Sequence, residues 1–196
     1  MTISTYAELQ AAVSSWGHRS DVTTQIQDFI RLAESTFSRK LRTRFQELAL
    51  AQTAIASNLV AVPANVVAVK SMWLVGYEAS PLKNQTLEFV IAQANPTGLS
   101  ANYAVQGSSY IFDGTGTVTG VLYRDIPALS DTNTTNWLLT AAPKAYLYGA
   151  LAEMAIYTQD MDNMKLWSSL RDMEIAEVQA ADDRDRFGGA LIARKR

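Results

Sequence analysis

The sequence contains no cysteine, which excludes disulfide bonds and thiolate metal sites. It contains one histidine, His18, and a Ser-His-Asp triad would have to use it. His18 lies beside Arg19 in a short turn that we expect between two helices, a poor position for a buried base. We therefore interpret His18 as a solvated loop residue.

The sequence also has no large excess of positive or negative charge, and it has no long hydrophobic run. Lysine plus arginine is 17 and aspartate plus glutamate is 19, a net charge of -2, whereas a general nucleic-acid coat would be basic. The apolar stretches of residues 59–75 are interrupted by Pro63, Asn65 and Lys70, so no membrane-spanning helix fits. Residues 1–12 lack the features of a signal peptide. We expect folding in a reducing cytoplasm, without a membrane anchor.

Helical signals begin the chain, and 48% apolar residues can supply a core. Thr5-Tyr6-Ala7-Glu8 predicts a capping box, and Gly17 is expected just past the end of that helix. Asp21 or Thr23 is predicted to cap a longer second helix. The apolar stripe of this second helix is Ile26, Phe29, Ile30, Ala33, Phe37 and Leu41.

The middle of the chain is rich in strand-forming residues. Strands are expected at residues 48–55, 59–62, 66–75 and 117–123. A hairpin is expected from residues 103–105 and 110–112, which flank Gly107-Ser108-Ser109. One short helix is expected at residues 86–94, with Leu87, Val90 and Ile91 on one side.

Helical signals return at Trp137, with Pro143 early in that helix, where proline is tolerated. Asp160 or Asp162 is predicted to cap a last helix, which carries Trp167, Leu170, Met173 and Val178. Gly188-Gly189 then interrupts the pattern.

These elements predict an α+β fold: an antiparallel helical bundle of two N-terminal and two C-terminal helices, with an inserted β-rich domain and an extended C-terminal arm. Residues 1–44 and 137–186 are expected to form the bundle, and residues 45–128 the insert. Residues 129–136 are a connecting loop, and residues 187–196 are the arm.

Two charged clusters suggest chemistry. The acids Asp182, Asp183 and Asp185 are the basis for a metal-dependent hydrolase as an alternative function. Because they alternate with arginines in a polar stretch, we expect them to be exposed and locally ion-paired. No cofactor is predicted.

The second cluster is basic and consists of Arg39, Lys40, Arg42 and Arg44. It is the basis for a nucleic-acid-binding regulatory protein as a second alternative. No aromatic residues alternate with it as stacking platforms, so complementation of the helix dipole or a subunit contact is favoured.

Many short segments, in order, resemble one family. They are Thr5–Leu9, Asp28–Glu34, Arg39–Arg42, Tyr103–Val105, Ile126–Ser130, Asn136–Leu139 and Tyr146–Leu151. Together they resemble the head-to-tail adaptor (connector) proteins of short-tailed bacteriophages, the tail tubular protein A-like adaptors, over roughly residues 3–178. The segment Leu99-Ser100-Ala101-Asn102 departs from the family pattern, in which proline often precedes the position of Tyr103.

The resemblance implies a structural virion protein, synthesised in the host cytoplasm, that forms a ring of usually twelve copies beneath the portal protein. The ring extends the DNA channel without binding DNA specifically, and it carries the tail nozzle or other tail proteins. The arm is then the portal-binding segment, through Phe187, Leu191, Ile192, Arg194, Lys195 and Arg196. The basic cluster becomes a candidate subunit interface.

Overall fold

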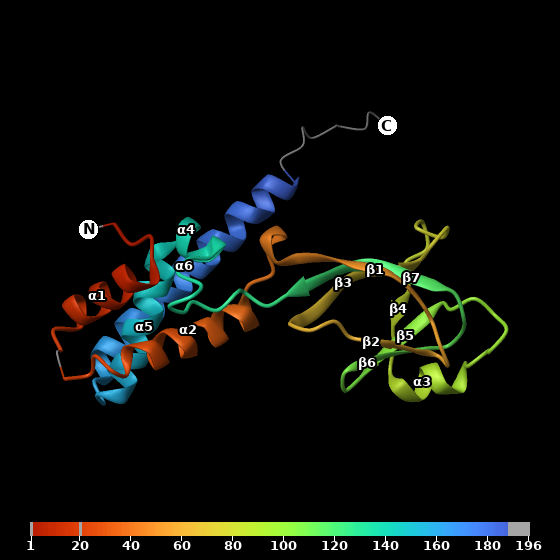
Figure 1. Ribbon diagram of the computed structural model, residues 1–196, viewed down its shortest axis with the longest axis horizontal. Coiled ribbons are helices and arrows are strands. Elements are labelled where there is room, and N and C mark those ends of the chain that lie inside the picture. The colour runs from red at the N-terminus through yellow and green to blue at the C-terminus, as the bar shows by residue number, and fades with distance from the viewer. Residues whose placement is uncertain (1, 20, 188–196) are drawn as a thin grey trace, which may run out of the picture. The chain divides into compact units, whose positions relative to one another are not determined.

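The computed structural model describes residues 2–19 and 21–187, and these form an α+β protein (Figure 1). The chain divides into two compact units. The helical unit consists of Met1–Phe45 and Ile126–Arg196, and the β unit consists of Gln46–Asp125. Each unit has a hydrophobic core of its own, so the two are described separately.

The first helix of the helical unit, α1 (Tyr6–Gly17), begins at the predicted capping box. The Glu8 amide donates to the Thr5 hydroxyl at 3.3 Å, and the Thr5 amide donates to the Glu8 carboxylate at 3.1 Å. The prediction for Gly17 was wrong by one residue, because Gly17 is still helical and His18 is the left-handed residue (φ 50°). A Cβ on Gly17 would lie 2.1 Å from Met154 Cε, so close packing explains the glycine.

The second helix, α2 (Ile26–Lys40), buries five residues of its predicted stripe, and the sixth, Leu41, is buried directly after the helix ends. The prediction that Asp21 or Thr23 caps it was wrong, because the residue before the helix is Gln25 and no side chain caps it. Arg19 instead holds the Asp21 carboxylate through two bonds of 2.7 Å. This hydrogen bonding lowers the pKa of Asp21 to about 2.

The helix expected from Trp137 is two helices, α4 (Trp137–Ala141) and α5 (Pro143–Tyr157), which meet at Ala142. Pro143 disfavours helical geometry in the residue before it, and Ala142 adopts φ -142° and ψ 68°. Asn136 caps α4 by accepting from the Leu139 amide at 2.8 Å. The sequence therefore predicted one helix where the structure has two.

The last helix, α6 (Met161–Phe187), is preceded by Asp160, as predicted. The Asp160 carboxylate accepts from the Asn163 amide at 3.1 Å. Of the apolar residues predicted for this helix, Trp167 and Val178 pack against the core, whereas Met173 is 58% exposed.

Helix α5 packs against each of α1, α2, α4 and α6. Most of its buried residues are small, which allows its neighbours to approach closely. A Cβ on Gly149 would lie 2.9 Å from both Ala33 Cβ and Phe37 Cζ of α2. Each large side chain buried in this core, such as Phe37 or Tyr146, contributes about 1.5–3 kcal/mol relative to exposure.

In the β unit the described residues form two sheets, with strand orders β1-β7-β3 and β2-β6-β5-β4. The predicted strands and short helix are confirmed, and β4 is an addition. The elements are β1 (Glu47–Ala54), β2 (Leu59–Ala61), β3 (Val66–Leu74), β4 (Lys83–Asn84), α3 (Leu87–Ala92), β5 (Asn102–Gln106), β6 (Ser109–Phe112) and β7 (Thr117–Arg124).

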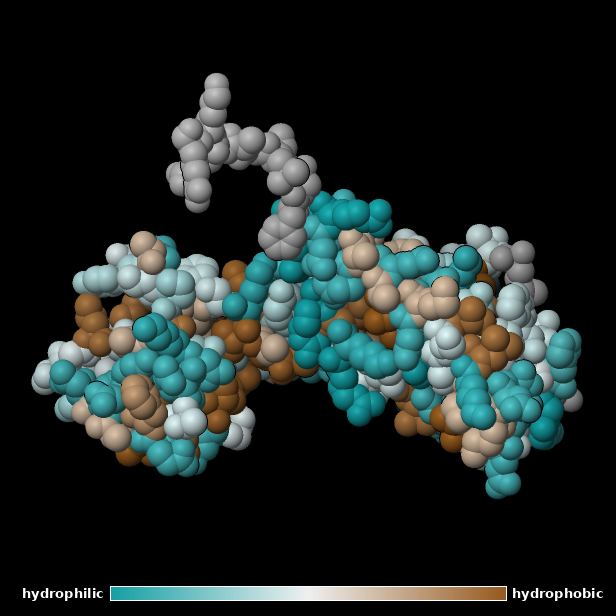
Figure 2. Space-filling model, turned by 180° about the vertical axis from the view of Figure 1, so that it is seen from behind, coloured by the Kyte–Doolittle hydropathy of each residue, from teal (hydrophilic) through white to brown (hydrophobic). Residues whose placement is uncertain are grey.

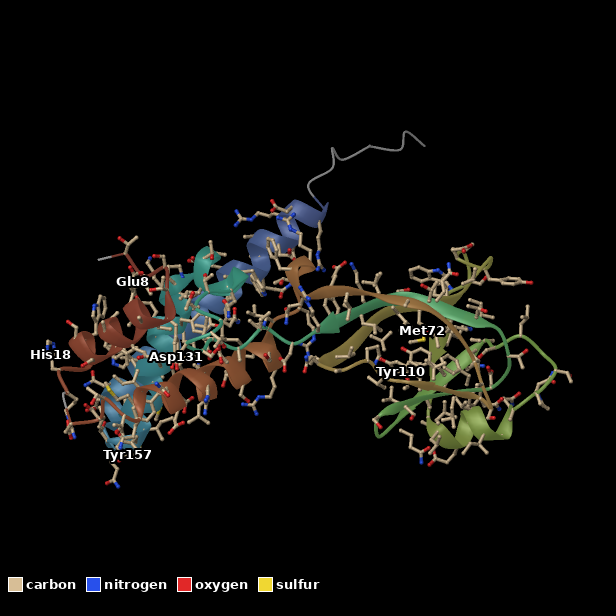
Figure 3. All side chains as sticks on the ribbon, in the orientation of Figure 1. Glu8, His18, Met72, Tyr110, Asp131 and Tyr157 are labelled. Carbon is tan, nitrogen blue, oxygen red and sulfur yellow. The ribbon has the colours of Figure 1, made fainter. Side chains whose placement is uncertain are left out.

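The predicted hairpin joins β5 and β6, and Gly107 has the positive φ of 57° that its tight turn requires. Side chains of both sheets share one core, including Met72 of β3 and Tyr110 of β6 (Figure 3). On α3, Val90 is buried but Ile91 is 61% exposed, so the expected apolar side of that helix was wrong at Ile91.

Asp113 ties together the chain before β5 and the end of β6. Its carboxylate accepts from the Ser100 hydroxyl at 2.7 Å, the Ala101 amide at 2.9 Å and the Asn102 amide at 3.0 Å. The Asn102 side chain adds a fourth bond of 2.6 Å. Burial acts to raise the pKa of Asp113, but these bonds outweigh it and hold the pKa below its ordinary value.

Candidate interaction surfaces

The basic cluster predicted from the sequence lies where α2 ends, and two of its cations are paired with α6 of the same chain. Lys40 Nζ lies 2.8 Å from Asp172 Oδ1, and Arg44 Nη2 lies 2.6 Å from Asp185 Oδ2. These side chains are all partly exposed, so each pair contributes at most about 1 kcal/mol. Lys40 and Arg44 are thus engaged in holding α6 to the end of α2.

Partial burial acts to raise the pKa of Asp172, but hydrogen bonds from Lys40 and Arg171 lower it below its ordinary value. The Asp172 carboxylate therefore stays ionised at neutral pH, and its ion pair with Lys40 persists.

Asp182 is the buried centre of this contact. It is only 4% exposed, so the expectation that it is exposed was wrong. Its carboxylate accepts from the Arg44 amide at 3.1 Å and lies 2.9 Å from Arg186 Nε. Asp183 and Asp185, in contrast, are exposed as predicted. Asp182 and Asp185 both lie near the Arg44 guanidinium, at 3.6 Å and 2.6 Å, whereas Asp183 accepts from Gln179 at 3.3 Å.

Arg42 is tied to α6 through its backbone. Its amide donates to Gln179 Oε1 at 3.2 Å, and Gln179 Nε2 donates to the Arg42 carbonyl at 3.3 Å. The Arg42 guanidinium donates to the Ser38 carbonyl at 2.7 Å, at the carboxyl end of α2, where a cation complements the helix dipole.

Arg39 differs from its three neighbours. It is exposed, and its Nε donates to the Ser35 carbonyl at 3.1 Å. Among the described residues it forms no ion pair with a carboxylate. Arg42 also has no ion pair among these residues but is half-buried, so Arg39 is the cation of the cluster that is both exposed and without an ion pair.

A buried polar network that no sequence pattern predicted lies deeper in the helical unit. Glu34 is 7% exposed and accepts from the Leu129 amide at 2.8 Å and from the Tyr146 hydroxyl at 3.1 Å. Asn136 Nδ2 donates to the same hydroxyl at 2.6 Å and to the Pro127 carbonyl at 2.8 Å. Burial, and then the charge of Glu34, raise the pKa of Tyr146. The network fixes the segment that leads into α4.

His18 lies on a hollow of about 620 Å³, at the end of α1, which is also lined by Trp16, Asp160, Asn163 and Trp167. His18 is exposed, as predicted (Figure 3). Trp167 stacks on Tyr148 at 5.7 Å between ring centroids, and Trp16 packs against Trp167 at 6.2 Å. These rings stabilise the contact of α1, α5 and α6.

The predicted portal-binding arm falls largely outside the described residues. Phe187 is the last residue of α6, and Leu191, Ile192, Arg194, Lys195 and Arg196 all lie beyond it. Within residues 2–19 and 21–187 there is no group of three or more histidine or acidic residues able to hold a metal ion. None of the helices described there is both long enough and apolar enough to cross a lipid bilayer.

The charged groups described above chiefly join elements of the same chain. The chain belongs to the SU10 adaptor protein family, whose model matches residues 4–194. The resemblance to phage head-to-tail adaptors is thereby confirmed. Membership implies a structural component of the phage virion that interacts with portal and tail proteins. No curated protein matches the chain.

Proposed function

We propose that this protein forms the head-to-tail adaptor ring under the portal, where it extends the DNA channel and provides the platform to which the tail attaches. The observation that carries the proposal is the family match across nearly the whole chain. The match covers the β unit and nearly all of the helical unit, so the proposal does not rest on one unit alone.

In this proposal the helical unit is an antiparallel bundle that serves as the ring wall, and the β unit is a domain inserted between its two halves. Support comes from the helical core, which combines residues 1–45 with residues after 126 around α5. A wall built in this way does not depend on the insert for its packing, so the β unit is available to face outward or to meet tail proteins.

The net charge of the chain is appropriate for the wall of a channel through which DNA must pass and from which it must exit. Each phosphate that a cation neutralises adds affinity through counterion release, and a strongly basic wall would therefore retain DNA. The net charge of -2, and the pairing of Lys40 and Arg44 with acids of α6, leave few free cations in the basic cluster. We infer that DNA passes without specific binding.

The experiment is to mix the purified chain with intact portal from the same phage and to image the product by electron microscopy. We expect a ring of density beneath the portal, with the same rotational symmetry as the portal or a simple fraction of it. Intact portal particles without added density would overturn the proposal.

A further inference from the structure

The side of α6 that faces away from the core carries an apolar seam. Ile175 and Asp182 are buried in the helical unit, and the opposite side presents the exposed Met173 and Glu177, with Leu170 half-buried beside them. Met173 is 58% exposed, and Leu166, one turn before Leu170, is 50% exposed. Apolar residues at alternating spacings of three and four form the seam through which one helix packs along another. We call Leu170, Met173 and Glu177 the outer α6 face.

Helix α2 has an outward side with the same spacing. Ala33 and Phe37 are buried, and the opposite side presents Leu32, which is 53% exposed, with Ser35 and Arg39. We call Leu32, Ser35 and Arg39 the outer α2 face. In each face the second residue lies three positions after the leucine, and the charged residue lies seven positions after it. If the two helices pack side by side in the same direction, the two leucines meet and the arginine meets the glutamate at the same time.

The charges of the two faces are complementary and unused. Four acids of α6 are ion-paired with other described residues, among them Asp172 with Lys40 and Glu174 with Lys144. Glu177, by contrast, forms no ion pair within the described part of the chain, and neither does Arg39. The face of the helical unit seen in Figure 2 carries hydrophobic areas separated by hydrophilic ones.

The two outer faces cannot meet within one protomer, because α2 and α6 both pack on α5 through their opposite sides. We propose that the outer α6 face of one copy binds the outer α2 face of a second copy, with Leu32 against Leu170 and Arg39 paired with Glu177. The inference rests on the proposed ring and names its subunit contact. Because the two faces differ, copies add head to tail, and such contacts close into a ring.

A contact between two helix faces is small compared with the roughly 1,200–2,000 Å² that stable interfaces bury. We therefore expect it to form when the portal holds neighbouring copies at high effective concentration. The free chain is then a monomer or a weak oligomer, and the portal sets the number of copies.

Charge reversal tests the pairing. Arg39→Glu and Glu177→Arg each place like charges in every subunit contact, and we expect loss of the ring on portal in electron micrographs. The double variant restores an opposite pair and should restore the ring. Asp183→Arg, an exposed acid of α6 outside the outer face, is the matched control and should leave the ring intact. Circular dichroism melts confirm that each variant is folded. Intact rings in both single variants would overturn the inference.

The absence of cysteine allows a second measurement. Ser35→Cys combined with Met173→Cys places one thiol on each face, and a disulfide forms only where the Cα atoms come within about 7 Å. We expect a ladder of covalent oligomers on portal under oxidising conditions. Rings that form without a ladder overturn the contact and leave the proposed function standing. Failure of the unmodified chain to form any ring on intact portal overturns both.

Discussion

The buried carboxylate of Glu34 on α2 accepts a hydrogen bond of 2.8 Å from the backbone amide of Leu129, 95 residues further along the chain. This bond joins the first half of the helical unit to the segment that returns from the β unit. Tyr146 donates to the same carboxylate from α5, so one side chain holds three separate parts of the chain.

Glu34→Ala should therefore destabilise the helical unit by about 3 kcal/mol, because a buried amide and a buried hydroxyl lose their acceptor. Glu34→Gln keeps one oxygen acceptor and should cost about 1 kcal/mol. Urea denaturation followed by tryptophan fluorescence measures the difference. A Trp73→Phe background leaves Trp16, Trp137 and Trp167, all in the helical unit, as the reporters. Equal losses in the two variants would contradict a role for the carboxylate oxygen.

Asp182 is buried, whereas its neighbour Asp183 is exposed. Substitutions at the two positions therefore form a matched pair of variants. Asp182→Ala should cost about 2 kcal/mol, because it leaves the Arg44 amide and the Arg186 guanidinium without their acid. Asp183→Ala removes an exposed acid and should change the free energy of unfolding by no more than about 0.5 kcal/mol. The same fluorescence measurement compares them, and a larger loss for Asp183→Ala would refute this account of the α2–α6 contact.

Asp113 should make the β unit sensitive to acid. Its pKa is lowered in the folded chain, so the unfolded chain binds more protons in the window between the folded pKa and the ordinary value of about 3.9. The stabilisation is fully present above that ordinary value and is lost as the pH falls through the folded pKa. Amide hydrogen exchange at Ala101 and Asn102 should therefore show less protection at about pH 3 than at pH 6, after correction for the intrinsic exchange rate.

Asp113→Asn is the control for this acid sensitivity, because it removes the titrating group and lowers protection at both pH values. If the unmodified chain and Asp113→Asn lose the same fraction of protection between the two pH values, another group is responsible.

Deletion of Gly188–Arg196 tests the proposed arm. Because the described elements end at Phe187, we expect the truncated chain to keep its melting temperature within a few degrees and to fail to bind portal in cosedimentation. A second variant, with Leu191 and Ile192 both changed to serine, removes only the apolar anchors and should weaken binding. Undiminished sedimentation of the truncated chain with portal would exclude the arm as the portal-binding segment.

Signals that act over a few residues were predictable from the sequence. The capping box at Thr5 and Glu8 spans a single turn, and the stripe of α2 follows directly from helical periodicity. The α5 boundary at Ala142 was missed although it is local, because Pro143 was interpreted only as tolerated in a first turn rather than as restricting the residue before it.

Features that depend on distant partners were not predictable. Asp182 lies in a polar run that indicates an exposed helix end, yet it is buried by the Arg44 backbone, 138 residues earlier in the sequence. Asp21 is of the right type for a cap, but α2 begins five residues later, at Ile26, and Arg19 holds the Asp21 carboxylate. The partners of Glu34 come from two other segments, and no spacing in the sequence indicates that they meet.

Native mass spectrometry of intact portal, before and after addition of the purified chain, tests the central claim most directly. The account predicts a single heavier species in which the added mass is a whole number of chains that matches the ring symmetry. Portal that keeps its original mass in the presence of excess folded chain would contradict the account.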